Sequence, residues 1–116
     1  MAQSPTQGMS TAMSTVLECF TTCETGVRHC LDRGGEHAAR DHITILLDCG
    51  AACGAMAVAM ARGSALHGRL AQLCADACDL CAASCERFPD DEVMRRCAEI
   101  CRRCAKECRA MQAAAA

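Results

Sequence analysis

The sequence predicts an all-α protein, an antiparallel up-down-up-down four-helix bundle with a cysteine-lined core. Helix-forming alanine, leucine, glutamate and arginine dominate its 116 residues, and runs of β-branched residues are short. Turn-forming residues break the chain at Gly34-Gly35, at Gly63-Ser64 and over 88–91. Cysteines recur with one helical spacing in all four segments between these breaks. Four helices of similar length joined by short connections are typical of such a bundle.

The four predicted helices cover residues 10–33, 38–62, 65–87 and 91–112. We expect residues 1–9 to form a flexible N-terminus and residues 113–116 a frayed tail. Asp90 or Asp91 suits the N-cap of the fourth helix, and Glu92 lies in its first turn, where the helix dipole favours an acid. The last turns of that helix carry the cations that the dipole favours there: Arg102, Arg103, Lys106 and Arg109.

The cysteines follow one interval pattern. Residues 74–85 (CADACDLCAASC) and 97–108 (CAEICRRCAKEC) show it in full, as steps of four, three and four. At about 100° per residue, these offsets fall in a helical stripe about 60° wide. The same template started at Cys19 and at Cys49 places every other cysteine, and its three remaining slots hold Gly26, Met56 and Met60. The stripe contains Cys19, Cys23, Cys30, Cys49, Cys53, Cys74, Cys78, Cys81, Cys85, Cys97, Cys101, Cys104 and Cys108.

The stripe is expected to face the bundle interior, because cysteine is a small hydrophobe and among the most buried residue types. Charged residues such as Asp76 and Lys106 lie on the opposite side of their helices. The predicted apolar flanks of the stripe are Leu17, Phe20, Val27, Leu46, Leu73, Leu80 and Ile100. Antiparallel neighbours at one level have a constant index sum, so the third and fourth helices should pair Cys85 with Cys97, Cys81 with Cys101, Cys78 with Cys104, and Cys74 with Cys108.

Several function classes are disfavoured. A net charge of −2, two phenylalanines and no tryptophan or tyrosine argue against nucleic-acid binding. No Ser-His-Asp pattern, phosphate loop or recognisable carboxylate pair indicates an enzyme. The opening MAQSPTQGMSTAMS lacks the features of a signal peptide, and AACGAMAVAMA is too short to span a bilayer, so no membrane association is expected. We therefore expect a cytoplasmic protein, in whose reducing compartment thiols stay free or bind metal.

Three interpretations of the thiols remain open, namely disulfides, a zinc or iron–sulfur site, and copper(I) binding. Disulfides could join the third and fourth helices as in helical hairpins with paired CxxxC motifs, with a redox or structural role, although thirteen is an odd number. Zinc storage would need tetrahedral groups of four ligands, whereas the cysteine ladder is continuous. The bacterial ferredoxin run of cysteines is absent, which disfavours an iron–sulfur cluster.

Copper(I) fits the pattern best, because this soft ion prefers thiolate and thioether ligands. It accepts a near-linear pair of sulfurs about 4–4.5 Å apart, and side chains at i and i+4 can reach that separation. Each CxxxC is then a copper(I) clip on one helical turn, at 19/23, 49/53, 74/78, 81/85, 97/101 and 104/108. Bridging thiolates between facing clips would allow about one ion per cysteine, on the order of a dozen in all.

Residues beyond the thiols extend the stripe. Met56 and Met60 continue it on the second helix, either as core or as thioether ligands. His42 and Met94 prolong two stripes at one end of the bundle, and His67 and Met111 do so at the other. These four residues could pass copper in or out, or could be ordinary half-buried residues at the bundle ends. His29 and His37 are expected in surface or turn positions and receive no role.

From about Leu17 to Met111, the motifs CFTTC, LDCGAAC, LCADACDLCAASC and RRCAEICRRCAKEC resemble the cysteine-rich four-helix-bundle copper storage proteins. The resemblance implies a homotetramer of bundles whose interior cysteines bind many copper(I) ions, for storage, detoxification or both. The absence of a leader resembles the cytosolic branch of that family. The thirteen cysteines would then be the copper ligands, and Gly26, Met56 and Met60 are departures from the pattern. A copper-delivery partner is not identified by the resemblance.

Overall fold

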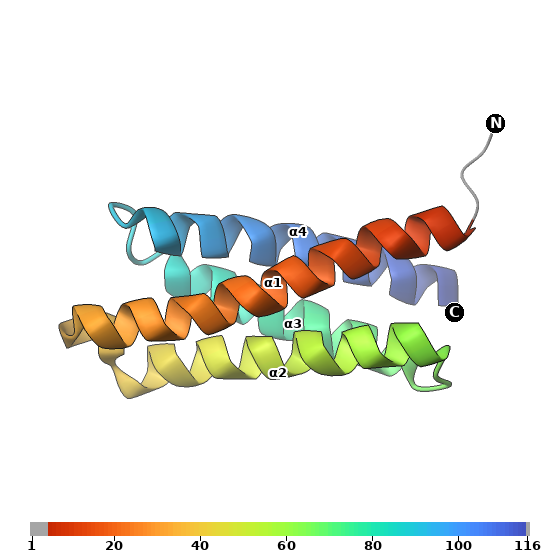
Figure 1. Cartoon of the computed structure of the whole chain (residues 1–116), viewed down its shortest axis with the longest axis horizontal. Coiled ribbons are helices and arrows are strands. Elements are labelled where there is room, and N and C mark those ends of the chain that lie inside the picture. Colours follow the sequence, from red (N-terminus) through yellow and green to blue (C-terminus); the bar gives the residue numbers. More distant parts are fainter. Residues whose placement is uncertain (1–4, 116) are drawn as a thin grey trace.

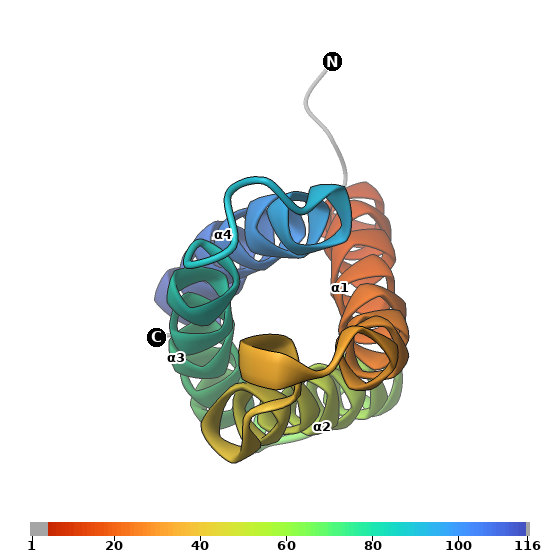
Figure 2. The same ribbon diagram turned by 90° about the vertical axis from the view of Figure 1, so that its left-hand side faces the viewer.

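The computed structural model describes residues 5–115, and the side chains of residues 11–112. Four α-helices follow one another: α1 (Pro5–Arg33), α2 (Arg40–Arg62), α3 (His67–Cys85) and α4 (Glu92–Ala115). They run alternately up and down the long axis (Figure 1) and form a ring in which α1 packs beside both α2 and α4 (Figure 2). No strand occurs among residues 5–115. The predicted fold class is confirmed.

The helix boundaries differ from the predicted ones at several ends. Helix α1 begins at Pro5 rather than at residue 10, since proline is favourable in the first turn of a helix. Residues 5–9 and 113–115, predicted to be flexible or frayed, are helical, while residues 1–4 and 116 lie outside the described part. A short 3-10 helix, η1 (Gly35–Ala38), occupies the α1–α2 connection and delays the start of α2 to Arg40. Helix α3 is two residues shorter at each end than predicted.

The connections use glycine where the backbone turns left-handed. Gly34, Gly35 and Gly63 have φ values of 71°, 58° and 62°, which glycine adopts without a steric cost. Gly63 ends α2, and its N–H and that of Ser64 donate to the last carbonyls of the helix, including the Ala59 carbonyl. The breaks predicted from the sequence are therefore true helix ends.

Asp91 caps α4, which decides between the two predicted caps. Its Oδ1 accepts hydrogen bonds from the backbone N–H groups of Val93 at 2.9 Å and Met94 at 3.2 Å. Two of the free N–H groups of the first turn are thereby satisfied. The cap fixes the start of α4, and with it the height of the first stripe residues of that helix.

The core is built from sulfur and small side chains. All thirteen cysteines are 0% exposed, and among the larger side chains Leu46, Met56, Met94 and Val16 are fully buried. Alanines such as Ala75 lie beside the cysteine stripes and are also buried. Small flanking residues let the helices approach, so thiols from all four helices meet on the axis.

The prediction that leucines flank the interior stripe is wrong for three of them. Leu17, Leu73 and Leu80 are 46%, 56% and 63% exposed, whereas Leu46 and Ile100 are buried as expected, and Phe20 and Val27 are partly buried. Leu73 and Leu80 each precede a stripe cysteine by one residue, which turns them about 100° away from the interior, and Leu17 is turned by about 160°. Their direction on the helix therefore leaves these three side chains outside the interior.

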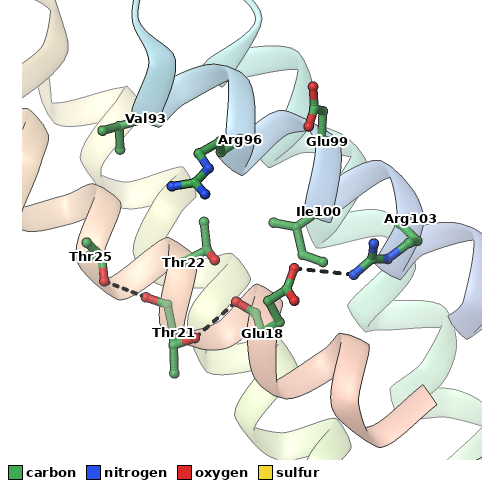
Figure 3. A pocket seen from close by; sticks show the side chains of 9 residues that line it. All are labelled: Glu18, Thr21, Thr22, Thr25, Val93, Arg96, Glu99, Ile100 and Arg103. Carbon is green, nitrogen blue, oxygen red and sulfur yellow. Dashed lines mark hydrogen bonds and ion pairs between the residues drawn. The ribbon is translucent and has the colours of Figure 1, made fainter. Parts of the chain in front are cut away.

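Ion pairs connect the helices on the outside. Arg102 of α4 contacts Glu86 at 2.7 Å and Asp79 at 3.3 Å, and Arg103 contacts Glu18 of α1 at 3.2 Å. Figure 3 shows the Arg103–Glu18 pair in a polar groove between α1 and α4. Exposed pairs of this kind contribute about 0–1 kcal/mol each. They position the helices without forming a reactive constellation in the groove.

Helix α2 is long and apolar enough to cross a membrane, by length and composition alone. This corrects the expectation that no segment is long enough to span a bilayer, which rested on the shorter run AACGAMAVAMA rather than on the full 23 residues of the helix. Half of its most apolar window is buried inside the bundle, and the core helix of a globular protein meets the same criterion. The criterion is therefore weak evidence for a membrane span.

Candidate metal centre

Thiols from all four helices meet at the middle of the bundle. Cys19 Sγ of α1 lies 3.7 Å from Cys101 Sγ of α4 and 3.8 Å from Cys78 Sγ of α3. Cys49 Sγ of α2 lies 3.7 Å from Cys78 Sγ and 3.9 Å from Cys101 Sγ. The contacts 19–78 and 49–101 join helices that face each other across the ring (Figure 2). The sulfurs therefore fill the axis rather than lining one wall.

The thiols continue along the axis in overlapping groups. In each group all sulfurs lie within 4.8 Å of one another. The groups are Cys19, Cys53, Cys78 and Cys104; Cys19, Cys23, Cys49 and Cys101; Cys23, Cys81, Cys97 and Cys101; and Cys74, Cys104 and Cys108. Because Cys19, Cys23, Cys101 and Cys104 each belong to two groups, a metal bound in one group shares a ligand with the next.

The predicted register of α3 and α4 is confirmed. Cys81 shares a group with Cys101, and the pairs 78/104 and 74/108 likewise share groups. The fourth pair, Cys85 with Cys97, also interacts through its side chains. The Phe88–Asp91 turn therefore sets thiol against thiol along both helices.

The closest sulfur contacts are between helices, which the sequence did not show. Cys104 and Cys108 are the i, i+4 pair within hydrogen-bonding distance, at 4.0 Å, and the 19/23 and 97/101 pairs lie within 4.8 Å. By contrast, seven interhelical pairs lie at 3.7–3.9 Å, including 23/81 and 53/74. A metal in this core would find its nearest second sulfur on another helix as readily as one turn away.

All thirteen cysteines are free thiols. The shortest Sγ–Sγ separations of 3.7 Å are far longer than the roughly 2.05 Å of a disulfide bond. Hydrogen bonds between thiols shift their pKa values in opposite directions. The hydrogen bond with Cys101 lowers the pKa of Cys49 and outweighs burial, which raises it. The hydrogen bond with Cys19 raises the pKa of Cys101. A thiol that accepts hydrogen bonds from its neighbours is thus more acidic than the thiols that donate them.

The non-cysteine positions of the stripe are also internal. Met56 is 0% and Met60 5% exposed, so both lie in the core beside the thiols. At Gly26, an added Cβ would meet Leu46 and Met94 side-chain atoms at 3.6 Å. Bulky apolar groups therefore occupy the level that Gly26 leaves without a thiol.

One end of the thiol column has a mixed set of donors. The Nε2 atom of His42 lies 3.3 Å from Met94 Sδ and 3.4 Å from Cys30 Sγ, and the two sulfurs are 3.6 Å apart. All three side chains are fully buried. The structure thus brings together His42 and Met94, which the sequence placed at the same end, with the last thiol of α1. Thiolate, thioether and imidazole are all ligands of copper(I).

Ser84 orients this histidine, a role that sequence reasoning missed. Its Oγ lies 2.6 Å from His42 Nδ1 and also accepts a hydrogen bond from Arg87 at 3.2 Å. With Nδ1–H donating to Ser84, the Nε2 lone pair faces Cys30 and Met94. Burial, then the charge of Arg87, lowers the pKa of His42, so the imidazole is neutral. Burial, then the charge of Asp91, raises the pKa of Cys30 to about 11.

The other end holds the second predicted pair. His67 begins α3 and is half-buried, and its Nε2 is a buried atom without a hydrogen-bond partner in the described structure. Met111 is half-buried and packs against the core near the end of α4. No hydrogen bond joins these two side chains among the described residues, unlike the mutually bonded donors of the first end.

A third group of possible metal ligands, two histidines and an aspartate, was not predicted from the sequence. His29 Nε2 and His37 Nε2 lie 2.7 Å and 2.9 Å from the same atom, Asp91 Oδ2. Burial opposes ionisation of this carboxyl, but the hydrogen bonds from His29, Met94 N–H and His37 outweigh it and lower the pKa of Asp91 to about 2. The sequence feature that could have indicated this cluster is the position of both histidines beside the α1–α2 turn, at the end of the bundle where α4 begins.

Comparisons with known proteins agree with this geometry. Residues 5–113 match the family model described as copper storage protein. A crystal structure of a protein from Nitrosospira multiformis is similar, with 33% identity over 93% of this chain and 97% of that chain and a TM-score of 0.87. The Cu(I)-bound copper storage protein BsCsp3 is 26% identical over 90% of this chain and 98% of its own, with a TM-score of 0.85. No significant match was found among curated proteins. With nearly its whole length matched and its thiols gathered in one buried column, this chain belongs to the copper storage protein family.

Proposed function

We propose that the protein stores copper(I) by binding many ions to the cysteine thiolates in the bundle core. The observation that carries the proposal is the column of thirteen buried free thiols, eleven of which lie in overlapping groups. A soft monovalent ion with two- or three-coordinate preferences suits such a column, since bridging thiolates serve two ions at once. The Cu(I)-bound relative BsCsp3 supports the choice of metal.

Charge balance supports a loading of about one ion per cysteine. Thirteen thiolates in a buried core would carry thirteen negative charges, which low-dielectric surroundings strongly disfavour. One copper(I) per thiolate leaves the core neutral, at about thirteen ions for full loading. Partial loading leaves the remaining cysteines as neutral thiols, so uptake releases protons at every step.

The ligands we propose are the thirteen cysteines of the stripe. His42 and Met94 would complete a three-donor site with Cys30 at one end, where copper enters or leaves the column. His67 and Met111 would serve the other end more loosely, because no hydrogen bond joins their side chains among the described residues. Met56 and Met60 are proposed as supplementary thioether ligands on the basis of their burial beside the thiols.

The assembly we propose is a homotetramer in the cytoplasm, acting as a store or buffer without catalysis. Leu66, just before α3, and Leu73 and Leu80 within it follow one another every seven residues and are 55%, 56% and 63% exposed. A stripe of this size on the outside of a narrow bundle is suited to contact with another chain. Sedimentation of the wild type and of Leu73→Glu tests the assembly: the variant should sediment as a smaller species.

Zinc storage is the second candidate, and one observation favours it. Three groups contain four cysteines each, and their contacts of 3.7–3.9 Å match the edge of a tetrahedral zinc–thiolate site, about 3.8 Å for Zn–S bonds of about 2.3 Å. However, each tetrahedral site would leave two net negative charges buried, and the groups share members. Copper(I) therefore satisfies the core better.

An anaerobic titration of the reduced protein with copper(I) tests the proposal. The thiolate-to-copper absorption is easily followed because the chain has no tryptophan or tyrosine. We expect a break at about a dozen equivalents, with a strong chelator unable to compete earlier. A break at three or four equivalents, with zinc bound more tightly, would instead support tetrahedral zinc sites. Few free thiols before reduction would support disulfides.

A further inference from the structure

His29, His37 and Asp91 form a cluster outside the thiol column, and it joins three separate elements. His29 lies in the last turns of α1, His37 in η1, and Asp91 at the start of α4. In the end-on view of Figure 2, the connection between α1 and α2 lies over this end of the ring. One nitrogen from each histidine and one carboxylate oxygen lie within 4.8 Å of one another. We propose that this cluster is a binding site for one divalent cation of the zinc class, distinct from the copper(I) column.

The donor set separates this site from the copper core. Two imidazole nitrogens and a carboxylate oxygen suit borderline divalent ions such as Zn(II), whereas copper(I) prefers sulfur. Sulfur ligands are absent from this cluster, although Met94 and Cys30 lie close by along the chain. The same end of the bundle thus offers soft donors inside and harder donors outside.

The geometry needs only a small adjustment. Both Nε2 atoms point at one oxygen, at 2.7 Å and 2.9 Å. In a tetrahedral site with metal–ligand bonds of about 2.0–2.1 Å, neighbouring ligand atoms are about 3.3 Å apart. The three side chains would therefore separate by roughly 0.5 Å, and each histidine would carry its proton on Nδ1 instead of Nε2. A water molecule would take the fourth position.

The surroundings hold the ligands and leave a route for the ion. Asp91 is held by its capping bonds, with its side chain 6% exposed, and His37 stacks on Phe88 with ring centroids 4.0 Å apart. The side chains of His29 and His37 remain 25% and 13% exposed. A shallow hollow of about 260 Å³ lies over His37 and Asp91.

One neighbouring charge opposes a cation here. The guanidinium of Arg33 lies 3.7 Å from Asp91 Oδ2, and its side chain is 57% exposed, so it can swing into solvent when an ion enters. Arg87 also lines the hollow but contacts Asp41 and the Phe88 ring. A bound dication would replace Arg33 as the counter-charge of Asp91 and would tie α1, η1 and α4 together.

The test uses protein whose thiols are already filled. Copper(I) is loaded anaerobically to its measured capacity, which rests on the proposed function, and Zn(II) is then titrated calorimetrically while released copper is monitored. We expect one Zn(II) per chain without copper release. His37→Gln and His29→Gln should each weaken this binding at least tenfold, while Asp90→Asn, a matched change of the neighbouring exposed carboxylate, should leave it unchanged.

A residue-resolved measurement keeps the test independent of copper loading. Nitrogen chemical shifts of the histidine side chains, followed in the copper-free wild type, report whether Zn(II) reaches His29 and His37 even if other ions enter the thiol column. Shifts at both imidazoles would support the site. Zn(II) uptake without a change at either imidazole, or equal Zn(II) affinity of the copper-loaded wild type and of both folded glutamine variants, would overturn it and leave the cluster a hydrogen-bonded latch.

Discussion

The middle of the bundle and its Cys30 end carry the same stripe of residues but differ in chemistry. In the middle, the nearest polar neighbours of Cys19 are Cys78 and Cys101. At the end, Cys30 has no cysteine within hydrogen-bonding distance in the described structure and instead faces His42 and Met94. The middle therefore offers a metal several thiolates, whereas the Cys30 end offers one thiolate and two neutral donors.

Under the proposed function, this difference would separate the retention of copper from its exchange. A copper(I) ion in the middle would be shared by anionic ligands on several helices and held tightly. An ion at the Cys30 end would have one anionic ligand and two uncharged donors, so fewer anionic ligands would hold it. The level of Gly26, filled by Leu46 and Met94, lies between these two regions. Such an end site would allow the protein to release ions without unfolding its core.

The largest effect on copper(I) binding should come from removing thiols in the middle of the column. The triple change Cys19→Ala, Cys49→Ala and Cys101→Ala should lower copper(I) capacity by about three equivalents, at one ion per thiolate. It should also weaken the binding of the ions that shared these ligands. Copper per chain at saturation measures the loss, and Thr25→Ala, an exposed change on α1, is the control. A capacity equal to that of the wild type would show that the middle thiols are not ligands.

Acidity should affect the two regions unequally. In the first equivalents of a titration, before thiolates are shared between ions, an ion bound by two central thiolates displaces two protons. One bound at Cys30 displaces one, whose pKa burial raises to about 11. Lowering the pH by one unit should therefore weaken central binding about 100-fold and end binding about tenfold, as long as the thiols start protonated. Chelator competition at several pH values measures both slopes. Equal slopes would remove the distinction between the regions.

Changing the neutral donors should have a smaller effect. Met94→Leu keeps the volume of the side chain, for a stability cost below about 1.5 kcal/mol, but removes the thioether. We expect the loss of about one weakly held ion and slower transfer of copper to a chelator, with central loading unchanged. Stopped-flow transfer measures the rate. Met56→Leu, a matched change deeper in the core, shows whether any thioether would have the same effect.

The smallest effect concerns acid stability. The folded pKa of Asp91 is lowered to about 2, below the roughly 3.9 of an unfolded chain, so its stabilisation is complete above about pH 4 and is lost as the pH falls toward 2. The loss should approach about 2 kcal/mol, concentrated where α4 begins. Denaturation of the metal-free wild type and Asp91→Asn at pH 6 and pH 3 measures it. The difference between the two proteins should shrink at the lower pH.

The fold and the thiol positions were readable from the sequence because both depend on local periodicity. Steps of four, three and four fix the stripe on each helix, and the Phe88–Asp91 turn fixes the α3–α4 register. The end donors His42 and Met94 also followed from helical spacing. The helix starts at Pro5 and Arg40 did not, because turn chemistry in a 3-10 segment and a permissive first-turn proline override simple break signals.

Other features depended on how the four helices come together. No spacing along one helix reveals that Cys19 touches Cys78 and Cys49 touches Cys101, because contacts across a ring depend on its width and on the rotation of all four helices. The rotation of α3 about its axis likewise places Leu73 and Leu80 outside, although apolar side chains beside the stripe were expected in the core. His29, His37 and Asp91 meet because a turn, a helix end and a helix cap are brought to one point. Helical periodicity is a local property, so the cysteine side chains that face the axis could be derived from the sequence. Which of these thiols touch depends on packing between segments far apart in the chain, and it is seen only in the folded structure.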